Sequence, residues 1–434
     1  MKKNTAFRLA IHLVCATPLC ASASEAELMQ RLDKLAAELD QVKSELAAAK
    51  QKSDANDARS QASAATAATT STAPATVLSG YGEFSYNRPR NDASKTEADV
   101  RRAVIGIEHR FDDKTKMVGE FEFEHAVTSA TDKGEVAVEQ LFVEREFGNG
   151  LRAKGGLFLI PSGLLNTNHE PTAYYGVERN FVETAIIPST WREAGLGLSS
   201  SLDNGLTLDL GLTTGFDLTK WDASSTDGRQ SPLASIHQEG QLAKSRDLSY
   251  HAALNWRGMP GLLIGGSLFS GKAGHNGIAG QERSKLTVPN SRITLGEVHA
   301  RYTPGKWDLS TLYARGTISN TADLNQSLLG NPNLIAPTPI PKSFDGWYAQ
   351  AAYQAWKNAN YAFSPFVRYE QFNVARSYAG IAPGSTVTPS QTEKVSTIGA
   401  NFQVGEGIVL KADYQKFKAD PLRDRFDLGL GYAF

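Results

Sequence analysis

The sequence predicts a transmembrane antiparallel β-barrel of about sixteen strands over residues 77–434, preceded by a short α-helical coiled coil. Two observations predict the barrel. Short turns alternate with long polar loops along this segment, and the stretches between them alternate large apolar residues with small or polar ones. Such alternation gives a barrel strand one side toward lipid and one side toward the lumen. A heptad pattern closer to the N-terminus predicts the coiled coil.

The first 23 residues have the pattern of a secretory signal peptide. Lys2, Lys3 and Arg8 precede an apolar run that ends at an Ala-x-Ala cleavage site, residues 21–23. Both cysteines of the sequence lie inside this segment, so we expect a mature chain without thiols or disulfides. The formal net charge of −1 shows no basic bias, and nucleic acid is therefore not an expected partner.

Residues 24–52 are predicted to form the coiled coil. Apolar residues recur there at alternating spacings of four and three, at Leu28, Leu32, Leu35, Leu39, Val42, Leu46 and Ala49. This seam favours self-association of the helix, although a single surface helix packed on its own domain stays open. Residues 53–76 are rich in Ala, Ser and Thr without periodicity, and we expect them to form a flexible linker.

Turn residues divide the segment 77–434 into strands. The seven short turns are 112–114, 148–150, 203–205, 258–260, 304–306, 357–360 and 405–407. The eight longer connections lie near 87–99, 126–134, 161–190, 217–247, 272–291, 319–343, 374–391 and 419–423. Eight loops and seven turns require sixteen strands with both termini at the short-turn end, as is typical of outer-membrane barrels. A large soluble all-β protein stays open, because alternation alone does not show which face meets lipid.

The last strand, from Phe426 to Phe434, places a large apolar residue at every second position. It resembles the C-terminal strand of bacterial outer-membrane barrels, and this resemblance implies recognition by the β-barrel assembly machinery. An edge strand of a soluble sandwich is the alternative, but such edges are normally blunted by charge or proline.

Two other strands fit the alternation poorly. The stretch 135–147 mixes its faces, and 307–318 changes parity near Thr311, which predicts a bulge there.

The third long loop, residues 161–190, is the most informative connection. A solvated loop of this length would have little reason to contain Ile186 and Ile187. If the loop folds into the barrel, these residues pack against the wall and Glu178 and Arg179 enter the lumen. An extracellular lid or a latch between subunits is the alternative.

Charged residues at inward strand positions and in this loop are predicted to line the pore or its constriction. They are Arg179, Glu178, Arg192, Arg102, Arg110, Arg152, Lys154, Arg368 and Lys411. Carboxylates such as Glu122 and Asp413 interleave with them. Rings of one sign would select ions of the opposite sign, whereas a mixed lining predicts weak selectivity. For each single charge, a cross-strand ion pair that braces the wall is the alternative.

Three stretches around the third loop carry a family resemblance. Residues 156–163 read Gly-x-Phe-x-x-Pro-x-Gly, while 168–180 and 187–191 include Asn-His-Glu-Pro, Tyr-Gly-Val-Glu-Arg-Asn and Ile-Pro-Ser-Thr-Trp. They resemble the phosphate-selective porin O/P family of bacterial outer-membrane porins. The resemblance covers residues 78–434 and implies a trimeric, sixteen-stranded channel. It does not settle phosphate specificity, because many members carry a lysine where this sequence has Leu159.

The expected function is that of an outer-membrane porin, a water-filled channel for passive diffusion of small hydrophilic solutes, with anions such as phosphate as candidates. The expected location is the bacterial outer membrane, and the expected partners are these solutes, outer-membrane lipid and further copies of the chain in a homotrimer. The sequence contains no G-x-S-x-G, P-loop or H-E-x-x-H motif, so we expect no enzyme activity, cofactor or metal site. Two alternatives stay open. One is a structural barrel tethered through its coiled coil, and the other is a barrel-borne hydrolase, whose Ser/His/Asp convergence residue spacing cannot reveal.

Overall fold

The structure is a computed structural model that describes Lys34 and residues 75–129, 131–275, 278–279, 286–287 and 290–434. The predicted signal peptide, the predicted coiled coil apart from Lys34, and the predicted linker up to residue 74 lie outside the described residues. The chain divides into two compact units, Met1–Gln51 and Lys52–Phe434, and the second unit contains all the described strands.

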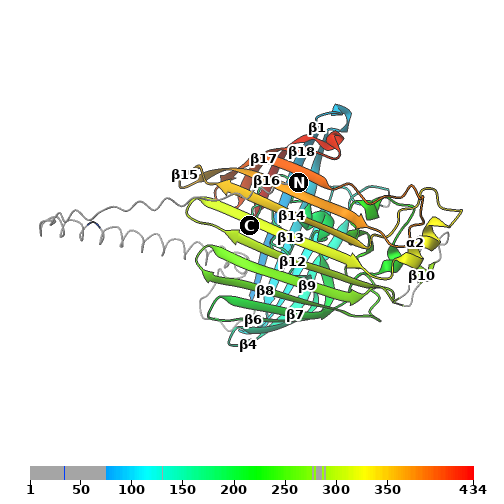
Figure 1. The fold of residues 1–434 in the computed structure, drawn as a ribbon. Coiled ribbons are helices and arrows are strands. Elements are labelled where there is room, and N and C mark those ends of the chain that lie inside the picture. The colour runs from blue at the N-terminus through cyan, green and yellow to red at the C-terminus, as the bar shows by residue number, and fades with distance from the viewer. Residues whose placement is uncertain (1–33, 35–74, 130, 276–277, 280–285, 288–289) are drawn as a thin grey trace, which may run out of the picture. The chain divides into compact units, whose positions relative to one another are not determined.

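Antiparallel strands form the wall of this second unit, and long connections make up much of the rest (Figure 1). The strands of the large sheet are β1 (Ala75–Pro89), β2 (Glu97–Arg110), β3 (Thr115–Glu124), β4 (Val136–Gly148), β5 (Leu151–Leu159), β6 (Arg192–Ser201), β7 (Leu206–Thr213), β8 (Ser249–Met259), β9 (Leu262–Lys272), β12 (Arg292–Tyr302), β13 (Trp307–Ile318), β14 (Ser343–Tyr353), β15 (Trp356–Lys357), β16 (Tyr361–Ser377), β17 (Glu393–Val404), β18 (Ile408–Phe417) and β19 (Arg425–Ala433). A separate two-stranded sheet joins β10 (Ile278–Ala279) to β11 (Leu286–Thr287).

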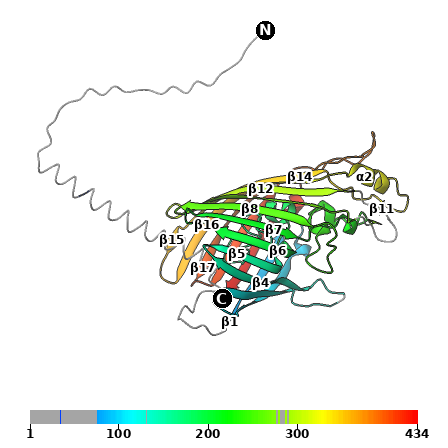
Figure 2. The same cartoon turned by 90° about the horizontal axis from the view of Figure 1, so that it is seen from below.

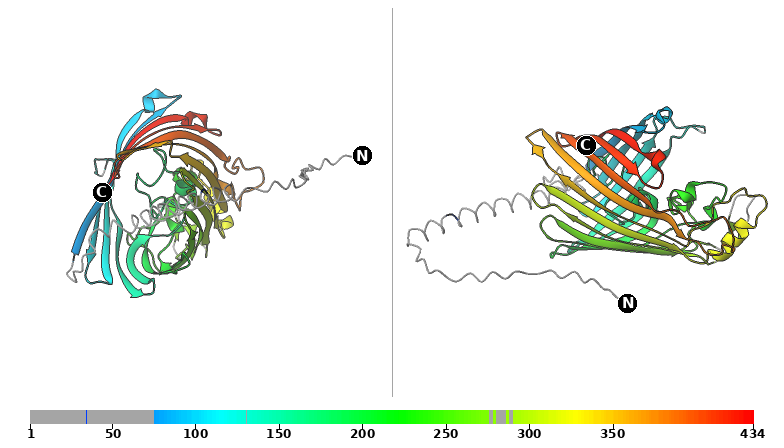
Figure 3. Two further views of the ribbon diagram at one scale, coloured as in Figure 1. Left: turned by 90° about the vertical axis from the view of Figure 1, so that its left-hand side faces the viewer. Right: turned by 45° about the horizontal axis from the view of Figure 1, so that its top comes forward.

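The large sheet closes on itself. Strands adjacent in the sequence pair with one another, β9 pairs with β12, and β1 pairs with both β2 and β19. The two-residue β15 continues the line of β14 along β16, so the barrel has sixteen full strands. The predicted sixteen-stranded antiparallel barrel is therefore confirmed, and Figure 3 (left) shows the strands arranged in a ring. The first strand begins at Ala75 rather than at the expected residue 77.

Turns and loops sort to opposite ends of the barrel, as predicted. The turn at Gly148, Asn149 and Gly150 has positive φ values of 92°, 53° and 73°, which explains why glycine and asparagine stand there. Helical segments occur in the long connections, and Figures 1 and 2 show α2 at the end opposite β15. They are η1 (Ala93–Lys95), the π-helix η2 (Val182–Ile186), η3 (Leu218–Lys220), η4 (Asp227–Arg229), η5 (Ala234–Ile236), α2 (Ala322–Leu329) and η6 (Pro421–Arg423). None of the described helices is both long and apolar enough to span a membrane.

The wall shows the alternation that the sequence predicts. On β19, Phe426, Leu428 and Leu430 are about two-fifths exposed on the outer face, whereas Asp427 is fully buried on the inner face. Burial of the acidic side chain and exposure of the apolar ones is the reverse of a soluble protein and the rule for a barrel in lipid.

The register shifts at five places among the described strands, and two of these bulges bear on the inner face. The one between β3 and β4 explains the strand 135–147, which fitted the alternation poorly. Between β3 and β4 the register shifts so that Glu139 has no direct partner, and Glu139 and Gln140 both face inward. Between β1 and β2 the register shifts at Arg101 in the same way. An extra residue in one strand re-aims the side chains that follow it. The bulge predicted near Thr311 is wrong, because β13 keeps a continuous register with both neighbours.

The apolar core lies inside the barrel at the long-loop end. Trp191 stacks on Phe216 with ring centroids 5.1 Å apart and meets Phe269 edge-on at 4.6 Å. Trp221 donates its indole N–H to the carbonyl oxygen of Thr338 at 3.0 Å, which ties the connection between β7 and β8 to the one between β13 and β14. The long loops thus pack on one another and on the inner wall.

Candidate functional site

The third loop, residues 160–191 between β5 and β6, has its two ends fastened together. The backbone N–H of Ile160 donates to the carbonyl oxygen of Trp191 at 2.9 Å. Asn166 donates its side-chain amide to the carbonyl oxygens of both Ile160 and Trp191 at 2.8 Å, and it accepts from the Trp191 N–H at 2.7 Å. The loop therefore leaves the wall from a narrow, hydrogen-bonded base.

Two glycines of the Gly-x-Phe-x-x-Pro-x-Gly run are required by this geometry. Gly156 has φ +138°, and a Cβ there would lie 2.3 Å from the carbonyl oxygen of Leu141. Gly163 has φ +76°, and a Cβ there would lie 2.4 Å from Oε1 of Glu183. Only glycine tolerates both the backbone conformation and the close approach.

Glu183 organises the interior of the loop. Its carboxylate accepts backbone N–H bonds from Leu164 at 2.6 Å and Leu165 at 2.7 Å. It also accepts from the amide of Asn180 at 2.7 Å and from the hydroxyl of Tyr348 on β14 at 3.2 Å. Burial raises the pKa of Glu183, and these hydrogen bonds partly oppose that effect. The carboxyl group thus closes a turn of the loop and fastens it to the wall.

A second contact with the wall is made by His169. Its Nε2 lies 2.6 Å from Oε1 of Glu139 on β4 and 2.9 Å from the hydroxyl of Tyr81 on β1. Its Nδ1 lies 3.0 Å from the carbonyl oxygen of Asn166. Because both ring nitrogens face acceptors, the arrangement favours the doubly protonated imidazolium. Burial lowers the pKa of His169, but the charge and hydrogen bond of Glu139 more than offset this and raise the pKa above 6.5.

A third contact centres on Glu178. Arg101 on β2 donates two hydrogen bonds of 2.7 Å to its carboxylate, and Asn87 on β1 donates one of 3.0 Å. Arg425 on β19 lies 3.5 Å away. Burial raises the pKa of Glu178, but the adjacent arginines outweigh burial, and the pKa stays well below 4.5.

Strands β16 and β18 hold the backbone of the same segment. Arg368 donates to the carbonyl oxygens of Tyr175 and Glu178, each at 3.2 Å. Asp413 accepts from the N–H of Val177 at 2.6 Å. The third loop therefore lies along the inner faces of β1, β2, β4, β14, β16, β18 and β19 rather than beyond the rim of the barrel.

Four of the predicted site residues pair with carboxylates. The pairs are Arg102 with Glu83 at 3.5 Å and Glu122 at 3.1 Å, Arg110 with Glu108 at 3.2 Å, Arg192 with Glu239 at 3.0 Å, and Arg368 with Glu370 at 2.9 Å. Only the contacts of Arg102 join neighbouring strands, as the alternative of a cross-strand ion pair requires; Arg110 and Arg368 pair along their own strands, and Arg192 pairs with the connection between β7 and β8. A role for these residues in lining the channel stays a prediction.

The remaining predicted cations, Arg179, Lys411, Arg152 and Lys154, differ in exposure. Arg179 is 7% exposed and donates to the hydroxyls of Ser189 and Thr190 and to the carbonyl oxygen of His169, all within the loop. Lys411 is buried, with its ammonium 3.4 Å from the ring centroid of Tyr174. Arg152 and Lys154 on β5 are partly exposed, and Lys154 lies over the Phe158 ring at 4.3 Å.

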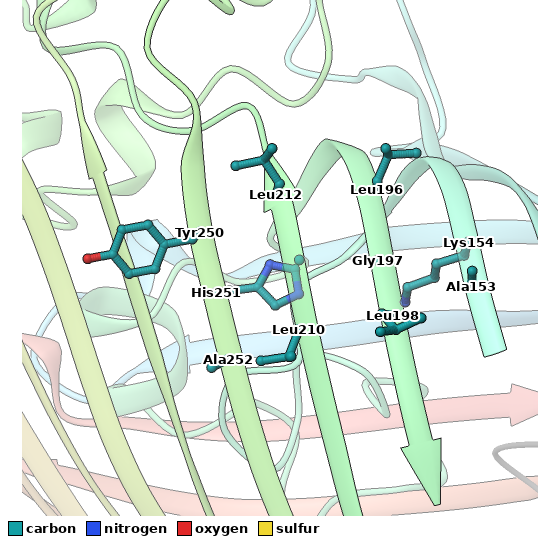
Figure 4. Close-up of a pocket in the computed structure, with 11 residues that line it drawn as sticks. Ala153, Lys154, Leu196, Gly197, Leu198, Leu210, Leu212, Tyr250, His251 and Ala252 are labelled. Carbon is teal, nitrogen blue, oxygen red and sulfur yellow. The ribbon is translucent and has the colours of Figure 1, made fainter. Parts of the chain in front are cut away.

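The wall of β5 to β8 has different inner and outer surfaces (Figure 4). On the inner face, Lys154 and the ring of His251 lie over Gly197 and Gly211, where a Cβ would come within 3.0 and 2.1 Å of them. A depression of about 540 Å³ is lined by four leucines exposed on the outer face, Leu196, Leu198, Leu210 and Leu212, and by Tyr250, two alanines and two glycines, with Lys154 and His251 behind the glycines. Its apolar lining assigns it to the outer surface rather than to a solute path. Within the described residues, no group of three or more His, Cys, Asp or Glu side chains is placed to hold a metal ion.

Comparison with known proteins agrees with this architecture. A family model described as "Phosphate-selective porin O and P" matches residues 72–421. The chain belongs to this family. This porin is therefore an outer-membrane channel, and its location is the bacterial outer membrane. The family and the barrel are those of a channel rather than of an enzyme.

Individual relatives of the porin are distant. An uncharacterized protein of Aquifex aeolicus is 26% identical over 354 residues, which is 78% of this chain and 74% of that protein. The Salmonella typhi OmpF complex with daunomycin matches with TM-score 0.55 and 14% identity, over 83% of this chain and 97% of that one. A loop L8 deletion mutant of Vibrio cholerae OmpT matches with TM-score 0.52 and 11% identity, over 83% and 100%. At these identities the solved structures support the fold alone.

Proposed function

We propose that this porin is a passive diffusion channel for small hydrophilic solutes whose narrowest part is formed by the third loop. The observation that carries the proposal is the attachment of this loop, through Glu178, His169 and Glu183, to wall strands around the inside of the barrel. A loop of about thirty residues held inside a sixteen-stranded barrel reduces the open cross-section. The channel then passes solutes by size more than by specific binding.

We further propose a weak preference for anions, contributed by Arg152 and Lys154. Neither side chain has a carboxylate oxygen within 4.0 Å among the described residues, and both are partly exposed on the inner face of β5. The preference is weak because the register places Glu146 opposite Arg152 and Glu144 opposite Lys154. A strong phosphate preference is not supported, because Leu159 is buried and apolar where many family members carry a lysine.

Removing both accessible cations, with Arg152→Gln and Lys154→Gln together, is expected to lower the chloride-to-potassium permeability ratio by about twofold to tenfold. The reason is that unpaired cations lining an aqueous channel raise the local concentration of anions, whereas a cation whose hydrogen bonds lie within the loop faces the channel less. The measurement is the reversal potential in asymmetric KCl. Arg179→Gln is the matched comparison, since Arg179 is bonded within the loop, and it should change the ratio less. A larger effect of Arg179→Gln would show that the third loop, rather than β5, sets the ion selectivity.

We also propose that the porin is a homotrimer that the β-barrel assembly machinery inserts into outer-membrane lipid through its last strand. The predicted heptad seam in 24–52 and the apolar outer wall support self-association, and the apolar row from Phe426 to Phe434 supports recognition. Chemical cross-linking of outer membranes should give a species of three chains.

Phe434→Ala should lower the yield of heat-modifiable barrel, and wild-type yield would count against the role of the last strand.

A further inference from the structure

Three arginines from three different strands converge on one residue of the third loop, Glu178. Arg101 binds its carboxylate with two parallel hydrogen bonds of 2.7 Å, and Arg425 approaches the same carboxylate to 3.5 Å. Arg368 donates to its backbone carbonyl oxygen at 3.2 Å. A paired guanidinium contact of this kind fixes both the position and the orientation of a carboxylate. We refer to Arg101, Arg425 and Arg368 as the Glu178 clamp.

The clamp spans the seam at which the barrel closes. Asn87 of β1 also bonds Glu178, and β1 pairs on one side with β2 and on the other with β19, the strands of Arg101 and Arg425. Arg101 reaches the lumen only because of the bulge opposite Glu83, which turns both Arg101 and Arg102 inward. A regular strand would aim Arg101 at lipid, where a charge is costly. The bulge thus serves the contact with the loop.

We propose that Glu178 is the positioning residue of the channel constriction, and that the clamp keeps the segment around it against the closing seam and out of the solute path. The proposal rests on the proposed function, in which the third loop forms the narrowest part. Without the clamp, residues 175–180 detach from the wall and enter the passage. The consequence is transient closure of an otherwise intact barrel.

The charges around Glu178 set the pH at which the clamp fails. Arg101 and Arg425 favour its carboxylate, while Asp413 on β18 and Asp427 on β19 lie close enough to oppose it electrostatically. Since the pKa of Glu178 is held below its ordinary value, the clamp is complete at neutral pH. It is lost as pH falls through that depressed pKa. Removing Arg101 raises the pKa of Glu178 and moves the loss to higher pH.

The test is single-channel recording of the full-length protein in planar bilayers over a series of pH values. For Arg101→Gln we expect closures about tenfold more frequent at neutral pH, because a hydrogen bond to a charged group is worth at least that ratio. We also expect the onset of acid-induced closure to move up by about one pH unit or more. Arg101→Lys should restore the onset in part, since lysine keeps the charge but loses the paired geometry. Arg145→Gln, which removes a surface pair with Asp112 at 3.6 Å, should behave as the wild type.

A purely structural role for the clamp makes a different prediction. In that case Arg101→Gln would lower the unfolding temperature but leave closure frequency and its pH onset at the wild-type values, and the proposal would be overturned. Glu178→Gln keeps the shape of the side chain, so it serves as the second variant if Arg101→Gln fails to fold, with the same expected rise in closures. Suppose that shortening the third loop raises conductance, but that Arg101→Gln and Glu178→Gln both close as rarely as the wild type. Only this inference then fails. If shortening the loop changes nothing, the proposed function fails first.

Discussion

Trp191→Ala is expected to lower the free energy of unfolding by about 3–5 kcal/mol, the usual range for removing a large aromatic side chain from a packed core. Trp191 is 1% exposed and contacts the rings of Phe216 and Phe269. Its indole N–H donates to Glu193 at 3.0 Å, so the substitution also leaves a buried carboxyl group with one partner fewer. The measurement is the temperature at which the folded, SDS-resistant barrel converts to the unfolded band.

Trp307→Ala is the control for that experiment. Trp307 is 48% exposed on the outer wall and packs beside Tyr353. Its loss therefore opens no cavity in the apolar core that the long loops form inside the barrel. The unfolding temperature should then fall much less than in Trp191→Ala. Equal shifts in the two variants would mean that the barrel wall, rather than the packed loops, limits stability.

His169→Gln is expected to loosen the third loop from β4 and to change how stability depends on pH. The substitution leaves Glu139, which is fully buried, without its cationic partner, and breaking a buried ion pair in this way costs about 3–5 kcal/mol. Because the pKa of His169 is raised in the folded protein, its contribution to stability is complete below pH 6.5. The contribution is lost as pH rises through the raised pKa.

Measuring the unfolding temperature over a series of pH values separates the His169–Glu139 ion pair from a general packing effect. Wild-type barrel should unfold at lower temperature as pH increases above the raised pKa of His169, and His169→Gln should remove most of that pH dependence. Tyr81→Phe, which keeps the ring but removes the hydroxyl 2.9 Å from His169, should retain it. An unchanged slope in His169→Gln would show that another group titrates.

The barrel itself was predictable because its signals are local. Each short turn needs residues that tolerate tight backbone geometry, and each strand repeats with period two, so a single sequence reveals both. The outward row on β19 and the turn at 148–150 follow directly from these rules. The supposed bulge near Thr311 failed because inward Leu312, Ala314 and Ile318 pack against the loop core. The sequence pattern assumed that apolar residues face lipid, so apolar residues on the inner face looked as if the outward positions had shifted by one.

The attachments of the third loop were less predictable, because they join residues far apart in the sequence. Glu178 and Arg101 are separated by 77 positions, and His169 and Tyr81 by 88. One local signal was present. Arg101 and Arg102 are consecutive on a predicted strand, and strict alternation would place one of them in lipid. Two adjacent charges in such a strand indicate a bulge, which would have identified Arg101 as an inward residue.

The central claim is that this porin is an open channel whose conductance is set by the third loop clamped inside the barrel. The most direct measurement compares single-channel conductance in planar bilayers between the wild type and a variant in which residues 167–187 are replaced by a short glycine-serine linker. We expect discrete conductance steps for the wild type and clearly larger steps for the variant. Steps of equal size, with both proteins folded and heat-modifiable, would contradict the claim and place the narrowest part of the channel elsewhere.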